Sequence, residues 1–362
     1  MSRKRMYHID LLRFIAALYV LFFHYCFRGY LKDGLSTIQF TSLEGFSKYG
    51  YLGVDLFFII SGFVILMSAQ NSDIIKFMIS RFSRLYPAYW VCLLLTATVM
   101  LFFGPALQKL SVSDILLNLT MFHGFFGIPH VDGVYWSLIV ELKFYIIIGI
   151  ILLFQGIKHI KLFALLLLGI AIMQLFFPFE DVSSPIKLLY FITFPNWSSY
   201  FIAGIFFFLL YKEGFKWYYL IAIFACYFTS LLYAFQHANN LALQFNREFN
   251  HVIVALFITI FYLVSYFISL DKLNIINKKY FLTLGVITYP LYLIHQNIGY
   301  VIITTFAPYL NKWVLLSLLI VFMLLLSLLI HKIIEKPLGN YFRSKLKHNK
   351  FILSMQSRIK RK

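Results

Sequence analysis

Long apolar stretches follow one another along the chain, and short segments between them carry most of its charges. A membrane-spanning helix needs about 20 mostly apolar residues. Ten stretches meet this requirement, at residues 9–28, 50–69, 85–104, 134–154, 161–177, 198–211, 217–236, 252–270, 281–306 and 313–333. The sixth is short, and Pro290 interrupts the ninth. The pattern predicts an all-α polytopic integral membrane protein with about ten transmembrane helices.

Composition supports this class and excludes others. Hydrophobic residues make up 61% of the chain, charged residues only 13%, and the mean hydropathy is +0.81. A soluble domain has about 25% charged residues, so disorder, a coiled coil and an ordinary soluble enzyme are excluded. An outer-membrane barrel would show alternating polarity rather than continuous apolar runs. The basic start resembles a signal peptide, but it lacks a small-x-small cleavage site, so we expect a retained first span.

The distribution of cations predicts the orientation. If both termini are cytoplasmic, the inner segments hold 23 Lys and Arg residues and the outer loops hold 7. The positive-inside rule favours this arrangement. It also explains the net charge of +18, because the cations would face anionic lipid of the inner leaflet rather than nucleic acid. We divide the chain into a transmembrane domain, 1–340, and a basic cytoplasmic tail, 341–362. The longest outer loop, about 105–133, could fold back onto the membrane.

Ionisable groups inside a span are costly, so each is a candidate for function. Arg13 and His24 both lie in the first span and are eleven residues apart. That spacing puts them on nearly the same helix face, separated by about 16 Å along the axis. They cannot touch, so one face carries a cation near the cytoplasm and an imidazole near the outer surface.

The other candidates divide by depth. In the predicted topology His24, Asp55 and Glu141 lie in the outer half of the membrane, and His295 lies somewhat deeper. Arg13, Arg81 and Arg84 lie near the cytoplasmic ends of their spans. This layout suits a polyanionic head on a long reactive arm, as in coenzyme A, because guanidinium groups bind phosphates by paired hydrogen bonds. No set of His or Cys residues shows metal-ligand spacing, and we expect no metal.

Each candidate also has a structural explanation. Arg13 could pair with the aspartate three positions earlier, and His24 could bond to a backbone carbonyl near the interface. Arg81 and Arg84 could be ordinary cytoplasmic anchors. Glu141 is harder to explain in this way, because a lone carboxylate in an apolar run needs a partner.

Six short motifs recur in order along the chain. They are residues 9–13 with His24, residues 50–63, the Arg-x-x-Arg element at 81–87, residues 135–141, residues 289–295 and residues 335–337. In the order and spacing of these six motifs the chain resembles the membrane-bound acyltransferase-3 family, the transmembrane O-acyltransferases of bacterial surface glycans. The resemblance runs nearly from end to end. It departs from the family in Lys143 and in the absence of a fused extracellular esterase-like domain.

The resemblance implies a multi-pass protein of the bacterial inner membrane. Its donor would be acetyl-CoA or another short acyl-CoA, used from the cytoplasmic side, with no permanently bound cofactor. Its acceptor would be a hydroxyl of a surface or lipid-linked glycan. The implied partners are thus acyl-CoA, a saccharide and membrane lipid, with a homo-oligomer possible. The same resemblance makes His24 essential and Arg13 important, and assigns Arg81 and Arg84 to donor binding.

We expect His24 to act as general base on the acceptor hydroxyl, or to accept the acyl group itself. Glu141 would orient the imidazole and stabilise its cation. The expected substrate-binding residues are Trp136, Ser137, Asp55 and His295. Of these, Asp55 could instead stabilise a helix start, and His295 could simply pack in the interior.

Two alternatives remain open. A transporter or flippase for a glycan or a small acid would also use intramembrane Arg, Glu and His along its path. The Arg13–His24 spacing with two further inner arginines has no evident use in transport, and it favours the enzyme. A non-catalytic assembly subunit is the other alternative, but it would not need acidic and basic groups together in the outer half.

Overall fold

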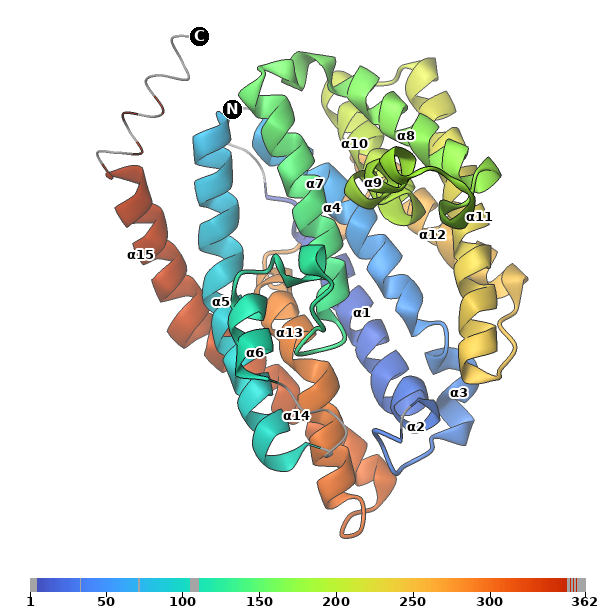
Figure 1. Ribbon diagram of the computed structural model, residues 1–362, viewed down its shortest axis with the longest axis vertical. Coiled ribbons are helices and arrows are strands. Elements are labelled where there is room, and N and C mark those ends of the chain that lie inside the picture. The colour runs from blue at the N-terminus through green and yellow to red at the C-terminus, as the bar shows by residue number, and fades with distance from the viewer. Residues whose placement is uncertain are drawn as a thin grey trace. The chain divides into compact units, whose positions relative to one another are not determined.

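The computed structural model describes residues 5–32, 34–70, 72–104 and 111–349, together with residues 352, 354 and 356. These residues form helices and connecting segments, with no strand among them (Figure 1). The α-helices are α1 (Tyr7–Phe23), α2 (Gly29–Leu31), α3 (Thr41–Ser47), α4 (Gly53–Ala69), α5 (Ile74–Phe103), α6 (Val112–Leu119), α7 (Tyr135–Leu153), α8 (Ile160–Phe176), α9 (Ser184–Thr193), α10 (Pro195–Glu213), α11 (Trp217–Phe245), α12 (His251–Ser269), α13 (Phe281–Phe306), α14 (Lys312–Ile330) and α15 (Lys336–Lys347). The π-helical turns are η1 (His24–Arg28) and η7 (His331–Glu335). The 3₁₀ turns are η2 (Gly50–Leu52), η3 (His123–Phe126), η4 (Gly156–His159), η5 (Phe179–Asp181) and η6 (Asn274–Ile276).

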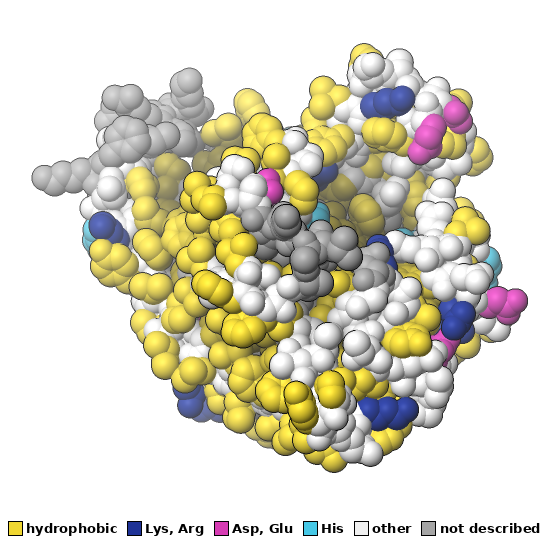
Figure 2. Space-filling view, turned by 60° about the horizontal axis from the view of Figure 1, so that its bottom comes forward, with side chains coloured by type: hydrophobic (Ala, Val, Ile, Leu, Met, Phe, Trp, Pro, Cys, Tyr) yellow, Lys and Arg dark blue, Asp and Glu magenta, His cyan; other side chains and the backbone are white. Residues whose placement is uncertain are grey.

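The prediction of a polytopic helical membrane protein is confirmed. Within the described ranges, nine helices are long and apolar enough to cross a membrane. A tenth crossing results if α9 and α10, which are bent by 42° at their junction, form one span. Hydrophobic side chains cover much of the face drawn in Figure 2, as expected for helices that contact lipid.

Two helices differ from the hydrophobic pattern in ways that bear on the site. Helix α5 begins at Ile74 rather than near 85, so Arg81 and Arg84 lie inside the helix and not before it. The backbone N–H of Lys76 donates to Asp73 Oδ1 at 2.9 Å, which caps this early start. Helix α13 runs unbroken through Pro290.

The chain divides into two compact units, and the first comprises Met1–Tyr51, Met78–Ile139 and Lys279–Lys362. In this unit α1 packs along α13 in the same direction. Asp10 meets Gly285 near the start of both helices, and Tyr25 meets Gly299 where η1 continues α1. Helix α14 packs on α13 and carries the chain to η7 and α15. Parallel packing of α1 and α13 agrees with their predicted places as the first and ninth spans.

The loop after α5 folds back onto that helix. Three aromatic side chains of α5 donate hydrogen bonds to carbonyl oxygens near the end of α6: Tyr86 to Thr120 at 2.8 Å, Tyr89 to Asn118 at 2.8 Å and Trp90 to Leu119 at 2.9 Å. Asn118 in turn donates to Pro129 O at 2.9 Å and accepts from Val131 N at 3.1 Å. Residues 105–110 of the predicted outer loop lie outside the described residues.

The second unit comprises Leu52–Phe77 and Val140–Lys278. Its centre is the parallel pair α4 and α10, with α8, α11 and α12 packed on α10. Gly62 lies against the Phe201 carbonyl and Gly204 against the Ile59 carbonyl, so a side chain at either position would push the helices apart. Small residues at such a crossing allow close backbone packing in membranes.

Candidate functional site

His24 stands at the point where α1 loses its regular geometry. It is the first residue of the π-helical turn η1, and its side chain is buried. Such turns occur frequently at functional sites, because they change the direction of side chains within a continuous helix. The imidazole Nδ1 and the hydroxyl of Tyr300, on α13, form a hydrogen bond of 3.0 Å. The two residues are 276 positions apart in the sequence.

Two glycines allow α13 to approach η1 closely enough for this hydrogen bond. Gly29 faces the ring of Tyr300, and a Cβ there would lie 2.6 Å from Cε1 of that ring. Gly299 faces the ring of Tyr25 in the same way. Tyr25 then donates its hydroxyl to the carbonyl of His295 at 2.7 Å. Each segment therefore packs a tyrosine ring against a glycine of the other: Tyr300 against Gly29, and Tyr25 against Gly299.

Two backbone carbonyls fix the tautomer that neutral His295 adopts. Its Nδ1 lies 2.9 Å from the carbonyl oxygen of Tyr292 and 3.2 Å from that of Leu291. Because carbonyl oxygens only accept, Nδ1 carries the proton and Nε2 holds a lone pair. Among the described residues Nε2 has no hydrogen-bond partner, although it is buried. The ring centroids of His295 and His24 are 5.0 Å apart, so the structure brings these two predicted residues together.

The first turn of α7 lies beside the same part of α13. Ser137 Oγ forms a hydrogen bond of 2.8 Å with the hydroxyl of Tyr292, and it donates to Val134 O at 3.1 Å. Trp136 is the neighbouring residue of this turn and is half-buried. Ser137 thus contacts the turn of α13 that precedes His295. The substrate-binding role of Trp136 and Ser137 stays a prediction.

The sequence analysis missed Asp132, a fully buried carboxylate in the segment before α7. Its Oδ2 accepts from the backbone N–H of Asn297 and its Oδ1 from that of Val134, both at 3.1 Å. The pKa of Asp132 is raised from 3.8 to about 7, because the effect of burial exceeds the opposing effects of these hydrogen bonds and of the charge of Arg28. Asp132 lies outside every predicted span, so a search for charges within spans could not find it. Its place three residues before α7 was the available signal.

A second group gathers cations around one acid. Arg13 on α1 and Arg84 on α5 both interact electrostatically with Glu335, at the end of η7. Glu335 also accepts from His331 Nδ1 at 2.8 Å. Arg81, one turn before Arg84, is buried. The structure therefore brings Arg13 and Arg84 to one acid, and their role in donor binding remains a prediction.

The predicted residues of the second unit have partners within it. Ser61 Oγ on α4 donates to Glu141 Oε1 on α7 at 2.7 Å, which supplies a partner for this half-buried carboxylate. Asp55 is buried and hydrogen-bonded to Tyr200 on α10. Lys143 donates to the carbonyl of Phe191 at 2.7 Å. No metal-binding group of His, Cys, Asp or Glu occurs among the described residues.

The sequence was compared with protein families and with known proteins. A family model described as an acyltransferase domain matches residues 6–332. The chain is 28% identical over 194 residues to the peptidoglycan O-acetyltransferase OatA of Listeria monocytogenes, covering 48% of this chain and 28% of that protein. It is 28% identical over 209 residues to a putative acetyltransferase of Acidianus two-tailed virus, covering 57% and 58%. It is 28% identical over 165 residues to nodulation protein 10 of Rhizobium leguminosarum, covering 40% and 44%.

The chain spans between 28% and 58% of the lengths of these relatives. No solved structure matches it. The family model, in contrast, extends over nearly the whole chain, from the start of α1 to η7. The match includes all the residues that the sequence motifs singled out except those at 335–337. On this evidence the protein belongs to the membrane-bound acyltransferase-3 family.

Proposed function

We propose that the protein transfers an acyl group from cytoplasmic acyl-CoA to a hydroxyl of a glycan, with His24 as the reacting imidazole. The observation that carries the proposal is the buried His24, whose Nδ1 is held by Tyr300. When Nδ1–H donates to the tyrosine oxygen, the lone pair of neutral His24 lies on Nε2. A neutral imidazole in one tautomer is what general-base or nucleophilic catalysis requires.

In the general-base route, the acceptor oxygen attacks the thioester carbon while its proton passes to His24 Nε2. The C–S bond then breaks, and the CoA thiolate leaves with the proton from the imidazolium. In the alternative route, Nε2 attacks the thioester carbon first, the C–S bond breaks and the CoA thiolate leaves; the acceptor hydroxyl then attacks the acyl carbon and the C–N bond to His24 breaks. In both routes Tyr300 orients the imidazole. In the alternative route, where His24 Nε2 is occupied by the acyl group, the lone pair of His295 Nε2 accepts the proton of the acceptor hydroxyl. The orienting role of Glu141 remains a proposal beside that of Tyr300.

The donor site is proposed at the cationic group. Arg13 and Arg84 both interact electrostatically with Glu335, and Arg81 is on the same helix as Arg84. Helix α1 is continuous from Arg13 to the residue before His24, so the axial separation of about 16 Å holds. An extended pantetheine arm along this face would deliver the thioester to His24. Replacing Arg84 by Ala should raise the KM for acetyl-CoA and leave kcat at saturating donor unchanged.

The acyl group and acceptor are inferred from relatives. The printed names of two relatives describe acetyltransferases, one of them acting on peptidoglycan. By analogy we propose an acetyl group, a surface or lipid-linked glycan as acceptor, and the bacterial inner membrane as the site of action. The multi-pass architecture supports a reaction within a bilayer, with a donor and an acceptor on opposite sides.

The test is transfer of labelled acetyl from acetyl-CoA in membranes that contain the protein. Wild type should acetylate the glycan, whereas His24→Ala should lose about 10²–10⁴-fold in rate while still inserting normally. His159→Ala, an exposed histidine of the second unit, is the matched control and should retain transfer. Undiminished transfer by His24→Ala would refute the role of His24. Movement of glycan across the bilayer without consumption of acetyl-CoA would instead indicate a flippase.

A further inference from the structure

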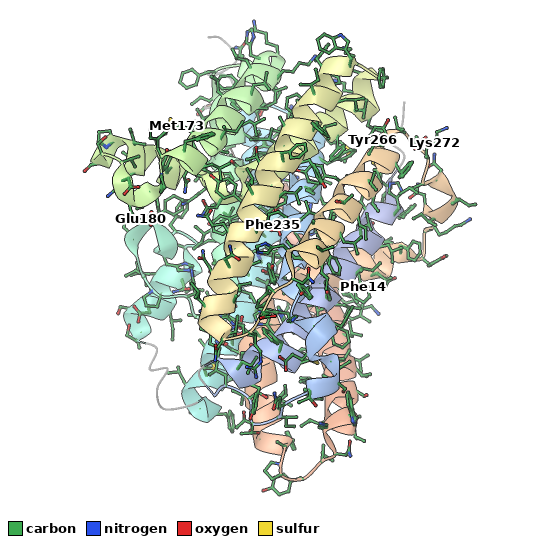
Figure 3. All side chains as sticks on the ribbon, turned by 90° about the vertical axis from the view of Figure 1, so that its right-hand side faces the viewer. Phe14, Met173, Glu180, Phe235, Tyr266 and Lys272 are labelled. Atoms are coloured by element: carbon green, nitrogen blue, oxygen red, sulfur yellow. The ribbon has the colours of Figure 1, made fainter. Side chains whose placement is uncertain are left out.

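A cavity of about 430 Å³ lies wholly within the second unit. Its walls come from the start of α4, from α7, from the end of α8 through η5 and α9 to the start of α10, and from the second half of α11. Figure 3 labels Glu180, which lines the cavity, and Phe235 on α11, which precedes the lining residue Gln236. The cavity thus lies at the end of the unit opposite the α10–α11 turn, which is the outer end in the predicted topology.

The chemistry of the walls points to a sugar. Aromatic faces are supplied by Trp197, Tyr190, Tyr200 and Phe179, and amides by Gln174, Asn196, Gln236 and Asn240. Aromatic rings pack against the C–H faces of a pyranose, while amides donate to and accept from its hydroxyls. The charged side chains are Asp55, Glu180 and Lys143, with no excess of cations for phosphates. The volume falls within the range of about 300–1,000 Å³ typical of small-ligand sites.

One polar atom of the wall still needs a donor. Gln174 Nε2 donates to Asn196 Oδ1 at 3.0 Å, which fixes how the amide is turned. Its Oε1 is buried and accepts no hydrogen bond from the residues that the structure describes. A buried acceptor without a donor costs free energy, and a ligand hydroxyl at this position would remove that cost.

Lys143, the residue that departs from the family pattern, helps to build the same wall. Its Nζ lies 3.6 Å from the ring centroid of Phe191 and donates to the carbonyl of that residue. This contact ties α9 to α7, so the bent segment before α10 closes one side of the cavity. Lys143 is therefore a positioning residue for the wall.

An apolar groove adjoins the cavity. It encloses about 620 Å³ and shares Gln174, Pro178 and Gln236 with the cavity. Its other walls are mostly apolar side chains of α8 and α11, among them Phe176 and Phe228, which are 75% and 48% exposed. A ligand with a polar head and a hydrocarbon tail would fill both spaces.

We infer that this cavity binds a sugar ring of the acceptor glycan, with the groove available to the chain of a lipid-linked saccharide. The inference rests on the proposed function and adds an acceptor site within the second unit. Trp197 provides the stacking face, and Gln174 Oε1 accepts from a sugar hydroxyl.

The experiment measures direct binding of purified protein in nanodiscs to a panel of soluble bacterial oligosaccharides and to the same saccharides on undecaprenyl phosphate. Wild type should bind at least one saccharide. Trp197→Ala and Gln174→Leu should each weaken that binding by tenfold or more. Trp197→Phe keeps an aromatic ring at this position and should retain most of the binding. Trp217→Phe, an exposed tryptophan at the start of α11, is the matched control and should bind as wild type does. Tighter binding of the lipid-linked form would show that the groove holds the chain.

Kinetics separate this inference from the proposed function. In an active enzyme, the cavity variants should raise the KM for acceptor and leave acetyl-CoA hydrolysis without acceptor unchanged. If wild type binds saccharide but transfers no acetyl, the proposed function fails while the cavity assignment stands. If no saccharide of either form binds, or if binding and acceptor KM are the same in both variants as in wild type, the assignment is overturned.

Discussion

At the scale of single residues, the groups that hold the His24 imidazole carry no charge. Charged residues inside apolar runs are conspicuous in the sequence because burying them is costly. A tyrosine in such a run gives no comparable signal. Tyr300 and Tyr25 were therefore not predicted, yet one is bonded to His24 and the other to the backbone of His295.

Removing the Tyr300 hydroxyl should slow the reaction without unfolding the protein. A hydrogen bond of this kind contributes about 1–1.5 kcal/mol, which corresponds to about tenfold in rate. We therefore expect Tyr300→Phe to lower kcat about tenfold, with the KM for acetyl-CoA unchanged, in steady-state assays of purified protein. Tyr309→Phe, whose side chain is 80% exposed, is the control. An unaltered kcat in Tyr300→Phe would show that another group orients His24.

Asp132 should make stability depend on pH. Because its pKa is raised to about 7 in the folded protein, the native state holds a proton that the unfolded chain releases near pH 4. The stabilisation is complete below about pH 4 and is lost as pH rises to about 7. A pKa raised from 3.8 to about 7 corresponds to at most about 4 kcal/mol of stability. Unfolding temperatures in detergent across this range should decline, and the decline should be smaller in Asp132→Asn; equal slopes would contradict the assignment.

At the scale of elements, the site depends on how α1 ends and how α13 meets it. The hydrophobic pattern predicted both helices but gave no sign of the π-helical turn at His24–Arg28. That turn and the facing glycines determine which side chains of the two helices meet. A helical period read from sequence assumes regular geometry, which α1 keeps from Tyr7 to Phe23, so the period cannot place the residues after His24.

Gly299→Ala should disturb the site through packing alone. A Cβ at this position would overlap the ring of Tyr25 and separate α13 from η1. Overpacking of this kind costs about 1–3 kcal/mol, and the displaced Tyr300 should lower acyl transfer by tenfold or more. Gly169→Ala on α8 is the control, because nothing lies within 4 Å of its Cβ position. Transfer assays and thermal unfolding measure both effects; wild-type behaviour of Gly299→Ala would mean that the contact is not needed.

At the scale of the whole molecule, the motifs divide between two units. The first unit holds Arg13, His24, Arg81, Arg84, Trp136, Ser137 and His295, and the second holds Asp55 and Glu141. The chain passes between the units along α5 and α7, so residues adjacent in sequence belong to different packing environments. This division was not visible in the hydrophobic pattern, because every span has a similar composition.

The predicted orientation can be tested with single cysteines. The native Cys26, Cys92 and Cys226 are free and buried, so they should not react with a membrane-impermeant maleimide. Lys187→Cys, on α9, should be labelled in intact cells, because the topology places α9 outside. His348→Cys, after α15, should be labelled only after permeabilisation. The reverse pattern would place both termini outside and contradict the positive-inside assignment.

The sequence by itself determined the membrane class, the helical fold and the order of the spans, because lipid demands long apolar helices wherever the chain crosses. It also singled out His24, His295 and the arginines, since ionisable groups in such helices are rare. Only the tertiary structure decided their partners. Tyr300, Asp132 and Glu335 reach their places through packing between segments far apart in the chain, and contacts of that kind leave no local periodicity to read.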